Sequence, residues 1–324
     1  MESDAGLVFA FILDGRGSGK NVDWQGVETW DPSVGLLWTH FDYSDEKVQD
    51  WLINKSGFPE IVRDALVDDE TRPRYVIFSE GVLVNLRGVN CNPGADPDDM
   101  VALRMFFSEK RIVSMRHRRV MAVDDVNKAL NAGQGPVSEA DFLVMITDRI
   151  SNRMGDVISD LSDGVDELED EILSGNSYEI LSSLALMRRQ AIRLRRFISP
   201  QRDVLSRIYQ EKISWMYELE KQHLREAADR TTRFVEDIDS IRERTAIMSE
   251  ELNNKLSEQM NKAMYLLSIV AAIFLPLGLI TGLLGINVGG IPGTDYKMAF
   301  TIVSLFLIVI AFGLLILFKR IKWI

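Results

Sequence analysis

Two long apolar segments stand near the end of the chain. No charged residue occurs in residues 263–294, and none occurs again in residues 298–318. An α-helix rises about 1.5 Å per residue, so about 20 apolar residues cross the roughly 30 Å hydrocarbon layer of a bilayer. We therefore expect a transmembrane domain over residues 263–324, with spans at about residues 265–284 and 298–318.

The connection between these spans, residues 285–297, is short and carries turn chemistry. It contains a Gly-Gly-Ile-Pro-Gly run at residues 289–293, in which glycine permits positive φ and proline stops a helix. The segment therefore predicts a helical hairpin. Basic residues flank the hairpin on its other side, namely Lys255, Lys262, Lys319, Arg320 and Lys322. This asymmetry predicts cytoplasmic termini and a periplasmic loop.

Shorter periodicities organise residues 1–134, where strand-like and helix-like runs alternate. Runs of strand-forming residues predict strands at residues 7–13, 74–78, 82–86, 101–107 and 111–115. Start signals of Ser and Pro before apolar runs predict helices at residues 44–54 and 59–67. Together these elements indicate a cytoplasmic α/β domain over residues 1–134.

Two short motifs in this domain resemble ligand sites. Residues 14–21 look like a phosphate loop, but Asp14 replaces its first glycine and Asn21 replaces its metal-binding hydroxyl residue. We interpret this stretch as a hairpin turn. The acidic run at residues 96–99 is interpreted as a solvated loop rather than a metal cage, because nothing nearby supplies the remaining oxygen ligands.

A period of 3.6 residues begins at residue 139 and continues to residue 172, which predicts a long amphipathic helix. Its outer face is acidic, and the helix expected after residues 174–176 carries Arg188, Arg189, Arg193, Arg195 and Arg196. We expect a cytoplasmic antiparallel helical hairpin over residues 135–199. Its charges either pair and solvate the two helices or attract cations directly.

Residues 201–275 contain neither glycine nor proline, which predicts a helical stalk over residues 200–262 that runs directly into the first span. Near residues 220–225 the apolar residues no longer keep to one face of the helix, which predicts a bend there. Apolar residues then follow a heptad-like spacing, at Phe234, Ile238, Ile241, Thr245, Met248 and Leu252. This seam packs either against other copies of the chain or against the chain's own domain.

Composition narrows the classes of partner. A net charge of -11 argues against nucleic acid, because phosphate binding needs clustered positive surface. A single cysteine and three scattered histidines give no metal-ligand spacing, so no bound cofactor is expected. Kinase and cyclase motifs are absent from the sequence, and we expect no enzyme activity.

Several segments resemble the CorA family of divalent-cation transporters. Gly285-Ile286-Asn287 corresponds to the family's Gly-Met-Asn loop. Residues 194–205 are similar to its Leu-Arg-Arg-x-x-x-Pro-x-Arg-Asp-Val-Leu segment, and residues 273–277 to its Ile-Phe-x-Pro-Leu segment. The loop has isoleucine where the family usually has methionine, and the Gly-Gly-Ile-Pro-Gly run at residues 289–293 follows it. In these two features the loop is similar to that of the ZntB-type zinc-transporter branch.

The resemblance implies the fold class and the assembly. The fold is expected to be that of an α+β multi-domain membrane protein, CorA-like, with a cytoplasmic α/β domain, a long helical stalk and a two-helix transmembrane hairpin. A homopentamer in the bacterial inner membrane would conduct hydrated divalent cations, with zinc as the expected substrate and protons or the membrane potential as the driving force. A magnesium, cobalt or nickel channel of the same family is the alternative, as is a membrane-anchored signalling or scaffold protein.

The resemblance also implies a pore formed by the first spans, with a ring of Asn287 at its outer mouth. The first span contains no acidic side chain, so amides would hold a hydrated ion through its outer shell. One helical face carries the expected lining, which is Asn261, Met264, Leu267, Ala271, Leu275, Gly278 and Gly282. Gly278 and Gly282 equally fit a GxxxG contact between helices, and Met264 and Leu275 could instead face lipid or pack.

Two further groups have more than one interpretation. Lys319, Arg320 and Lys322 form a cytoplasmic basic ring that either anchors the protein to anionic headgroups or acts as an electrostatic barrier. Glu226 occupies the position of an acid that, in the family, can bind a regulatory metal between subunits. Arg225 and Arg230 lie close in sequence, so we expect an ordinary ion pair at Glu226 instead.

Overall fold

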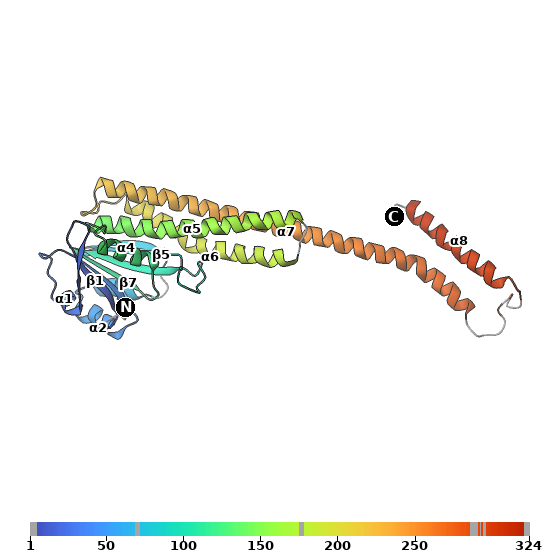
Figure 1. Cartoon of the computed structure of the whole chain (residues 1–324), viewed down its shortest axis with the longest axis horizontal. Helices are drawn as coiled ribbons and strands as arrows, with labels where there is room; N and C mark the ends of the chain where they lie inside the picture. Colours follow the sequence, from blue (N-terminus) through green and yellow to red (C-terminus); the bar gives the residue numbers. More distant parts are fainter. Residues whose placement is uncertain are drawn as a thin grey trace. The chain divides into compact units, whose positions relative to one another are not determined.

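The computed structural model describes residues 5–68, 72–174, 178–285, 291, 293 and 296–320. The chain forms two compact units, Met1–Ser249 and Glu250–Ile324, which are described separately below. The first unit contains a mixed sheet, the helices that cover it and the beginning of a long helix (Figure 1).

The sheet has seven strands in the order β2-β1-β3-β7-β6-β5-β4. They are β1 (Leu7–Leu13), β2 (Gly19–Val22), β3 (Leu36–Asp42), β4 (Arg74–Phe78), β5 (Gly81–Gly88), β6 (Val101–Ser108) and β7 (Arg111–Arg116). β3 and β7 are parallel, with Phe41 opposite Met115, and the other neighbouring pairs are antiparallel. The parallel pair lies at the centre, where both strands end at the same edge of the sheet.

Three short helices cover one face of this sheet: α1 (Trp24–Glu28), α2 (Glu46–Asn54) and α3 (Glu60–Val67). Asp23 and Asp45 cap α1 and α2, since each side chain accepts a hydrogen bond from a backbone N–H in the first turn. Aromatic side chains fill the layer beneath, with Trp51 4.9 Å from Phe41 between ring centroids. This aromatic layer is the core of the domain on that side.

The opposite face is covered by α4 (Met121–Asn131), α5 (Glu139–Ser174) and α6 (Tyr178–Ile208) (Figure 1). Phe142 of α5 packs on Trp38 of β3 at 4.8 Å between ring centroids. The Trp38 indole N–H donates to Ser114 Oγ at 2.9 Å, which satisfies a polar group that is otherwise buried in the core. Both layers of helices therefore fix the sheet.

The five strands and two helices predicted for this domain are present, but four elements were missed: β2, β3, α1 and α4. β3 is buried on both faces along almost its whole length. In a strand that is covered on both faces, apolar residues follow one another instead of alternating with polar ones. The two-residue period by which a strand is recognised in a sequence is therefore missing. Of the remaining three, β2 has four residues, α1 has five, and α4 has no capping side chain at Val120 to mark its start.

The hairpin turn predicted in residues 14–21 is present: residues 14–18 connect β1 to β2, and residues 19–21 already belong to β2. Asp14 Oδ1 accepts hydrogen bonds from the backbone N–H groups of Arg16 and Ser18, at 2.8 and 3.0 Å. Gly17 has a φ of 97°, and a Cβ there would lie 2.9 Å from the carbonyl oxygen of Gly133. Glycine is therefore needed for the conformation and for the close approach of another segment.

A helical stalk over residues 200–262 with a bend near residues 220–225 was expected, and the structure instead interrupts the helix earlier. α6 continues past Pro200 and ends at Ile208, and the next helix, α7 (Glu218–Leu284), begins after a nonhelical stretch at residues 209–217. Burial of Ile213 and Met216, together with stacking of Trp215 on Phe107 at 5.3 Å, fixes this turn against the domain. The break therefore precedes the bend that was predicted near residues 220–225.

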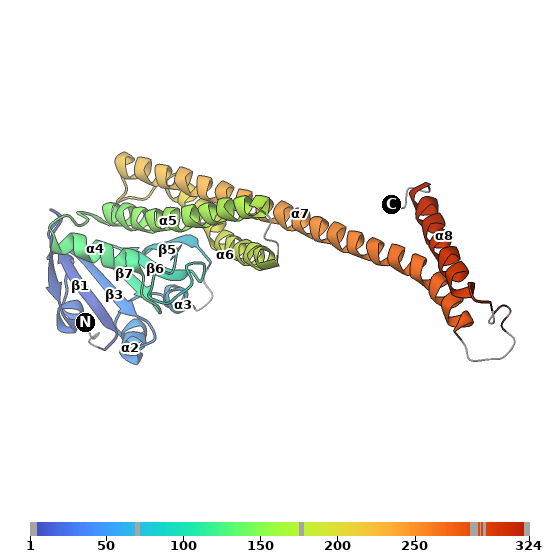
Figure 2. The same cartoon turned by 45° about the vertical axis from the view of Figure 1, so that its right-hand side comes forward.

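The heptad-like seam of α7 is buried within the chain at Ile238, Ile241, Thr245, Met248 and Leu252, and Phe234 is half-buried. Ile238, Ile241 and Thr245 are almost inaccessible, and a Cβ at Gly155 of α5 would lie 3.3 Å from the Phe234 ring. Figure 2 shows α7 beside α5 in this region. The seam thus packs against the chain's own domain, which was one of the two interpretations.

Ion pairs fasten this part of α7 to the hairpin of α5 and α6. On α5, Asp148 pairs with Arg230 and Asp166 with Arg244; on α6, Arg195 pairs with Asp239; each closest N···O distance is 2.6 Å. The acids of α5 and the arginines of α6 were expected to serve their own two-helix hairpin. The ion pairs named above instead join these side chains to a third helix, so α5, α6 and α7 form one packed group.

The second unit contains the end of α7 and α8 (Ala299–Arg320). Both α7 and α8 contain a stretch long and apolar enough to cross a membrane, with mean hydropathy of 2.4 and 3.0 over their most apolar windows. Neither window contains a buried residue within the chain. Such exposed apolar helices fit a lipid environment.

Candidate functional site

The apolar part of α7 has two different sides. Its less exposed residues recur every three or four positions, at Ile269, Ala272, Ile273, Pro276, Leu277 and Ile280. α8 carries a matching stripe at Ala299, Val303, Ser304, Leu307, Ile310, Ala311, Leu314 and Phe318. We infer that these stripes face each other in the hairpin.

The residues expected to line a pore lie on the other side of α7. All seven are exposed, from Asn261 and Met264 through Leu267, Ala271, Leu275 and Gly278 to Gly282. With 3.6 residues per turn, this stripe is roughly opposite the stripe that we assign to α8. The structure therefore gathers the seven predicted positions on one continuous surface that the chain itself leaves uncovered.

Glycine spacing on this surface has no partner within the chain. A Cβ at Gly278 or Gly282 would meet no atom within 4 Å, so neither glycine is in close contact with α8. The alternative of a GxxxG contact would therefore require a helix from another copy. Thr281 beside them donates its hydroxyl proton back to the Leu277 carbonyl at 2.9 Å, which hides that polar group within the helix.

Of the loop at residues 285–297, the structure describes residues 285, 291, 293, 296 and 297. Gly285 N–H donates to the carbonyl oxygens of Thr281 and Gly282, at 2.9 and 3.2 Å, and so closes the last turn of α7. Ile286 and Asn287 lie outside the described residues. A Cβ at Gly285 would be 3.1 Å from the Thr281 carbonyl, which is tighter than ordinary contact. The start of the predicted selectivity loop thus favours glycine.

Basic residues close the other end of the hairpin. Lys319 and Arg320 form the last turn of α8 and are exposed, and Lys322 lies outside the described residues. Cations are favourable at a helix C-terminus, where unsatisfied carbonyl groups carry partial negative charge. Both the anchoring and the barrier interpretations of this cluster remain proposals.

Glu226 does not form the expected ion pair. It is exposed on α7, and Arg230 is bound instead to Asp148 and to Asn152 Oδ1, the latter at 2.7 Å. No salt bridge to Glu226 occurs among the residues that the structure describes. Sequence proximity was misleading because Arg230 points to α5, across the packed seam, rather than along its own helix.

The acidic run at residues 96–99 differs from the solvated loop that was expected. Asp98 is only 4% exposed, and Arg193 Nε lies 3.0 Å from its carboxylate. The neighbouring Pro97 carbonyl accepts from Asn90 N–H at 3.1 Å, so the loop is tied to the domain. Asp99 forms an ion pair with Arg118, which lies outside the loop. The loop is therefore structural and partly buried, held by arginines.

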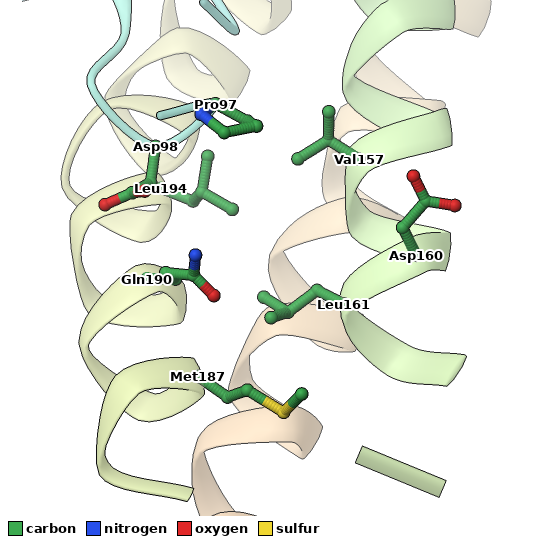
Figure 3. Close-up of a pocket in the computed structure, with 8 residues that line it drawn as sticks. All are labelled: Pro97, Asp98, Val157, Asp160, Leu161, Met187, Gln190 and Leu194. Atoms are coloured by element: carbon green, nitrogen blue, oxygen red, sulfur yellow. The ribbon is translucent and has the colours of Figure 1, made fainter. Parts of the chain in front are cut away.

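A cavity of about 220 Å³ borders this loop between α5 and α6. Figure 3 shows Asp98 and Asp160 on opposite sides of it, with their carboxylates pointing away from each other. Five of its eight lining residues are apolar, among them Val157, Leu161 and Leu194. Carboxylates that diverge cannot share an ion, and within the described ranges no three His, Cys, Asp or Glu side chains are grouped to hold a metal.

Known proteins are similar to this chain over almost its whole length. The family model described as CorA-like Mg2+ transporter protein matches residues 33–320. The zinc transport protein ZntB of Yersinia enterocolitica is 37% identical over 321 residues, covering 99% of this chain and 96% of that protein. The divalent cation transporter CmaX of Pseudomonas aeruginosa is 37% identical over 328 residues, covering 99% and 97%.

The fold is also matched. A structure of the full-length CmaX protein aligns with a TM-score of 0.86 at 36% identity, covering 100% of both chains. The expected fold class, an α+β multi-domain protein with an α/β domain, a long helix and two apolar C-terminal helices, is thereby confirmed. The chain belongs to the CorA-like Mg2+ transporter family, in agreement with the resemblance of its loop and helix motifs.

Proposed function

We propose that the chain transports divalent cations, with zinc as the principal substrate, across the bacterial inner membrane. The observation that carries the proposal is the uncovered stripe on α7, which runs from Asn261 to Gly282 and leads to the Gly285-Ile286-Asn287 loop. A surface that is mostly apolar, lies on a membrane helix and is free of its own hairpin partner suits a pore built from several copies. The names of the relatives, a zinc transporter and a divalent cation transporter, support the same substrate class.

The proposed assembly is a homopentamer with both termini in the cytoplasm. Five copies of α7 would line the pore, and five Asn287 amides would form its outer ring. Neutral amides cannot replace the hydration shell of a divalent ion at low cost, so the ring would bind the ion with its water. Apolar residues below the ring, such as Leu275 and Leu267, would form a narrow gate that opens for the hydrated ion.

Zinc is favoured over magnesium, cobalt or nickel by Ile286 in place of methionine in the loop and by the ZntB relatives. CmaX is equally similar to this chain and carries a broader name, so the substrate must be measured. Protons or the membrane potential would supply the driving force. The alternative is a scaffold protein that uses the transmembrane hairpin only as an anchor. Such a protein would need neither the uncovered stripe of α7 nor the Gly285-Ile286-Asn287 loop.

Flux measurements on reconstituted protein test this function. Purified chain in proteoliposomes should take up zinc when a pH gradient or a membrane potential is imposed, and imposing each alone identifies the driving force. Parallel assays with magnesium, cobalt and nickel rank the ions. Liposomes that stay impermeable to all four ions under both gradients would contradict the transporter function and favour the scaffold.

A further inference from the structure

A second cavity, of about 320 Å³, lies at one edge of the sheet, and its walls are rich in basic groups. It is lined by Tyr43, Arg87, Ala102, Arg104, His117 and Arg118. These residues come from four separate stretches of sequence, so no local motif predicts them. The sheet brings them together, since Tyr43 follows β3, Arg87 lies near the end of β5, Ala102 and Arg104 lie in the first half of β6, and His117 and Arg118 follow β7.

The location is typical of ligand sites. β3 and β7 are parallel neighbours, so their carboxyl ends meet at this edge, where Tyr43 N–H donates to the Arg116 carbonyl at 3.1 Å. In open α/β sheets, ligands bind in crevices outside the carboxyl ends of parallel strands. The cavity therefore occupies the position in the sheet where such a fold offers exposed side chains on a rigid support.

The two inner arginines are held in fixed orientations. Arg104, which is 2% exposed, donates from Nε to the Asp68 carbonyl at 3.1 Å and stacks 4.7 Å above the Tyr43 ring. Arg87 donates from Nη1 to the Met100 carbonyl at 2.9 Å and lies 4.6 Å from the Phe197 ring centroid. Carbonyl groups and aromatic rings therefore hold these two guanidinium groups in place.

The positive charges act on one another. Burial lowers the pKa of Arg87, and the neighbouring charges of Arg104 and Arg118 lower it further, whereas Tyr43 and Asp99 act in the opposite direction. Arg118 on the rim pairs with Asp99, and this hydrogen bond lowers the pKa of that carboxyl. Of the described residues that line the cavity, three are arginines and one is a histidine, whereas none is acidic. This concentration of positive charge stands in a chain whose net charge is -11.

We propose that this cavity binds a small phosphate-bearing anion, either inorganic phosphate or a phosphomonoester. Arginine presents two parallel N–H donors that match two phosphate oxygens, and a fixed guanidinium loses little freedom when it binds. A volume of about 320 Å³ is at the small end of the range for ligand pockets, which fits a phosphomonoester and excludes a polymer. This site is independent of the proposed pore.

Calorimetry on the full-length protein in detergent tests the site, with inorganic phosphate and AMP as separate probes and chloride used to hold the ionic strength constant. We expect saturable binding with one site per chain. Arg118→Gln and Arg87→Gln should each weaken it about tenfold or more, because each removes charge-assisted hydrogen bonds. Arg189→Gln is the matched control, since it removes the same charge from an exposed position of α6 outside the cavity.

The outcomes separate clearly. Tighter binding of AMP than of phosphate would identify a phosphomonoester site, and equal binding a site for phosphate itself. The Arg118 side chain is 42% exposed, so its replacement leaves the core intact and decides the matter even if Arg87→Gln does not fold. No saturable binding of either probe, or equal affinity in wild type and Arg118→Gln, would overturn the proposal.

Discussion

The long helix α7 passes through two environments, and the contrast between them separates structure from function. Its first part, up to Ser249, buries Ile238, Ile241 and Thr245 against its own chain and is fixed by arginine–carboxylate pairs. Its later part keeps most of its apolar side chains exposed, with Leu275 74% accessible. The same helix thus completes a folded domain at one end and leaves an unfilled apolar surface at the other.

This difference identifies where the chain needs something outside itself. Apolar surface in water costs about 25 cal/mol per Å², so the exposed part of α7 is stable only against lipid or against other copies of the helix. The first part has no such requirement. Mutations in the first part should therefore change stability, and mutations in the second should change transport with little effect on the folded domain.

The same change from apolar to polar in the two parts of α7 should give the largest contrast. Ile241→Asn places an amide in a buried seam and removes a side chain that is 2% exposed, so it should lower the free energy of unfolding by about 3 kcal/mol. Leu267→Asn changes a residue that is 69% exposed, and it should leave domain stability almost unchanged while it alters ion flux. Chemical denaturation followed by circular dichroism measures the first effect, and proteoliposome flux the second.

Ile241→Val is the control, because it removes volume from the seam without adding a polar group. It should lower the free energy of unfolding by about 1 kcal/mol. The comparison fails if Leu267→Asn destabilises the domain as much as Ile241→Asn does. It also fails if both variants conduct ions as the wild type does.

The next effect concerns the basic end of α8. Replacing Lys319, Arg320 and Lys322 with Gln should weaken retention in membranes that contain anionic lipid, at about 1 kcal/mol for each charge lost. Ion preference should change less than abundance. Quantification of membrane-bound protein and flux per molecule distinguish the two roles, since normal abundance with altered cation preference would instead favour the electrostatic barrier.

A smaller effect is expected at the ion pair between α6 and the first part of α7. Hydrogen bonds from Arg195 and then Arg242 lower the pKa of Asp239, so its charged form is favoured in the folded state. Asp239→Asn should cost about 0.5–1 kcal/mol at neutral pH, because the pair is partly exposed.

The pH dependence of this cost follows from the lowered pKa. The contribution of Asp239 is complete above the ordinary carboxyl pKa of about 4 and is lost as the pH falls through the lower native value. Unfolding curves of wild type and Asp239→Asn should therefore converge in strong acid. A difference that grows as the pH falls would contradict the assigned sign.

The smallest effect is expected for Glu226→Ala. Among the described residues, no ion pair to Glu226 is found that would explain a silent mutation. A divalent ion, however, needs several oxygen ligands, and no metal-binding group is found among these side chains either. Inhibition of zinc flux by internal divalent ions should thus be nearly the same in the variant. Loss of that inhibition in Glu226→Ala alone would show that ligands from a neighbouring subunit complete a regulatory site.

The parts of the fold that could be predicted from the sequence are those with a strong local period. Two uncharged stretches gave the apolar helices, a 3.6-residue period gave α5, and the glycines after Asp14 gave the β1–β2 turn. In each case the local sequence decides the structure, because length, period or positive φ admits few alternatives. The family motifs added the fold class.

Features that depend on distant contacts could not be predicted in this way. The break at residues 209–217 has no glycine or proline and exists because Ile213, Met216 and Trp215 pack on the domain. Partners of Arg230 and Asp98 were missed for the same reason. The arginine cavity is built from four stretches that meet only at the edge of the sheet. Sequence gave the exposed face of α7, whereas its role as a pore lining remains a prediction.

The central claim is that ions pass through a pore whose outer ring is formed by Asn287, and one flux comparison tests it most directly. Zinc uptake should be measured in proteoliposomes that contain equal amounts of wild type, Asn287→Ala and the control Asn131→Ala, which removes an exposed amide from α4. We predict that Asn287→Ala abolishes uptake, although it assembles normally on size-exclusion chromatography, and that Asn131→Ala behaves as the wild type. Wild-type zinc flux through a correctly assembled Asn287→Ala protein would contradict the account.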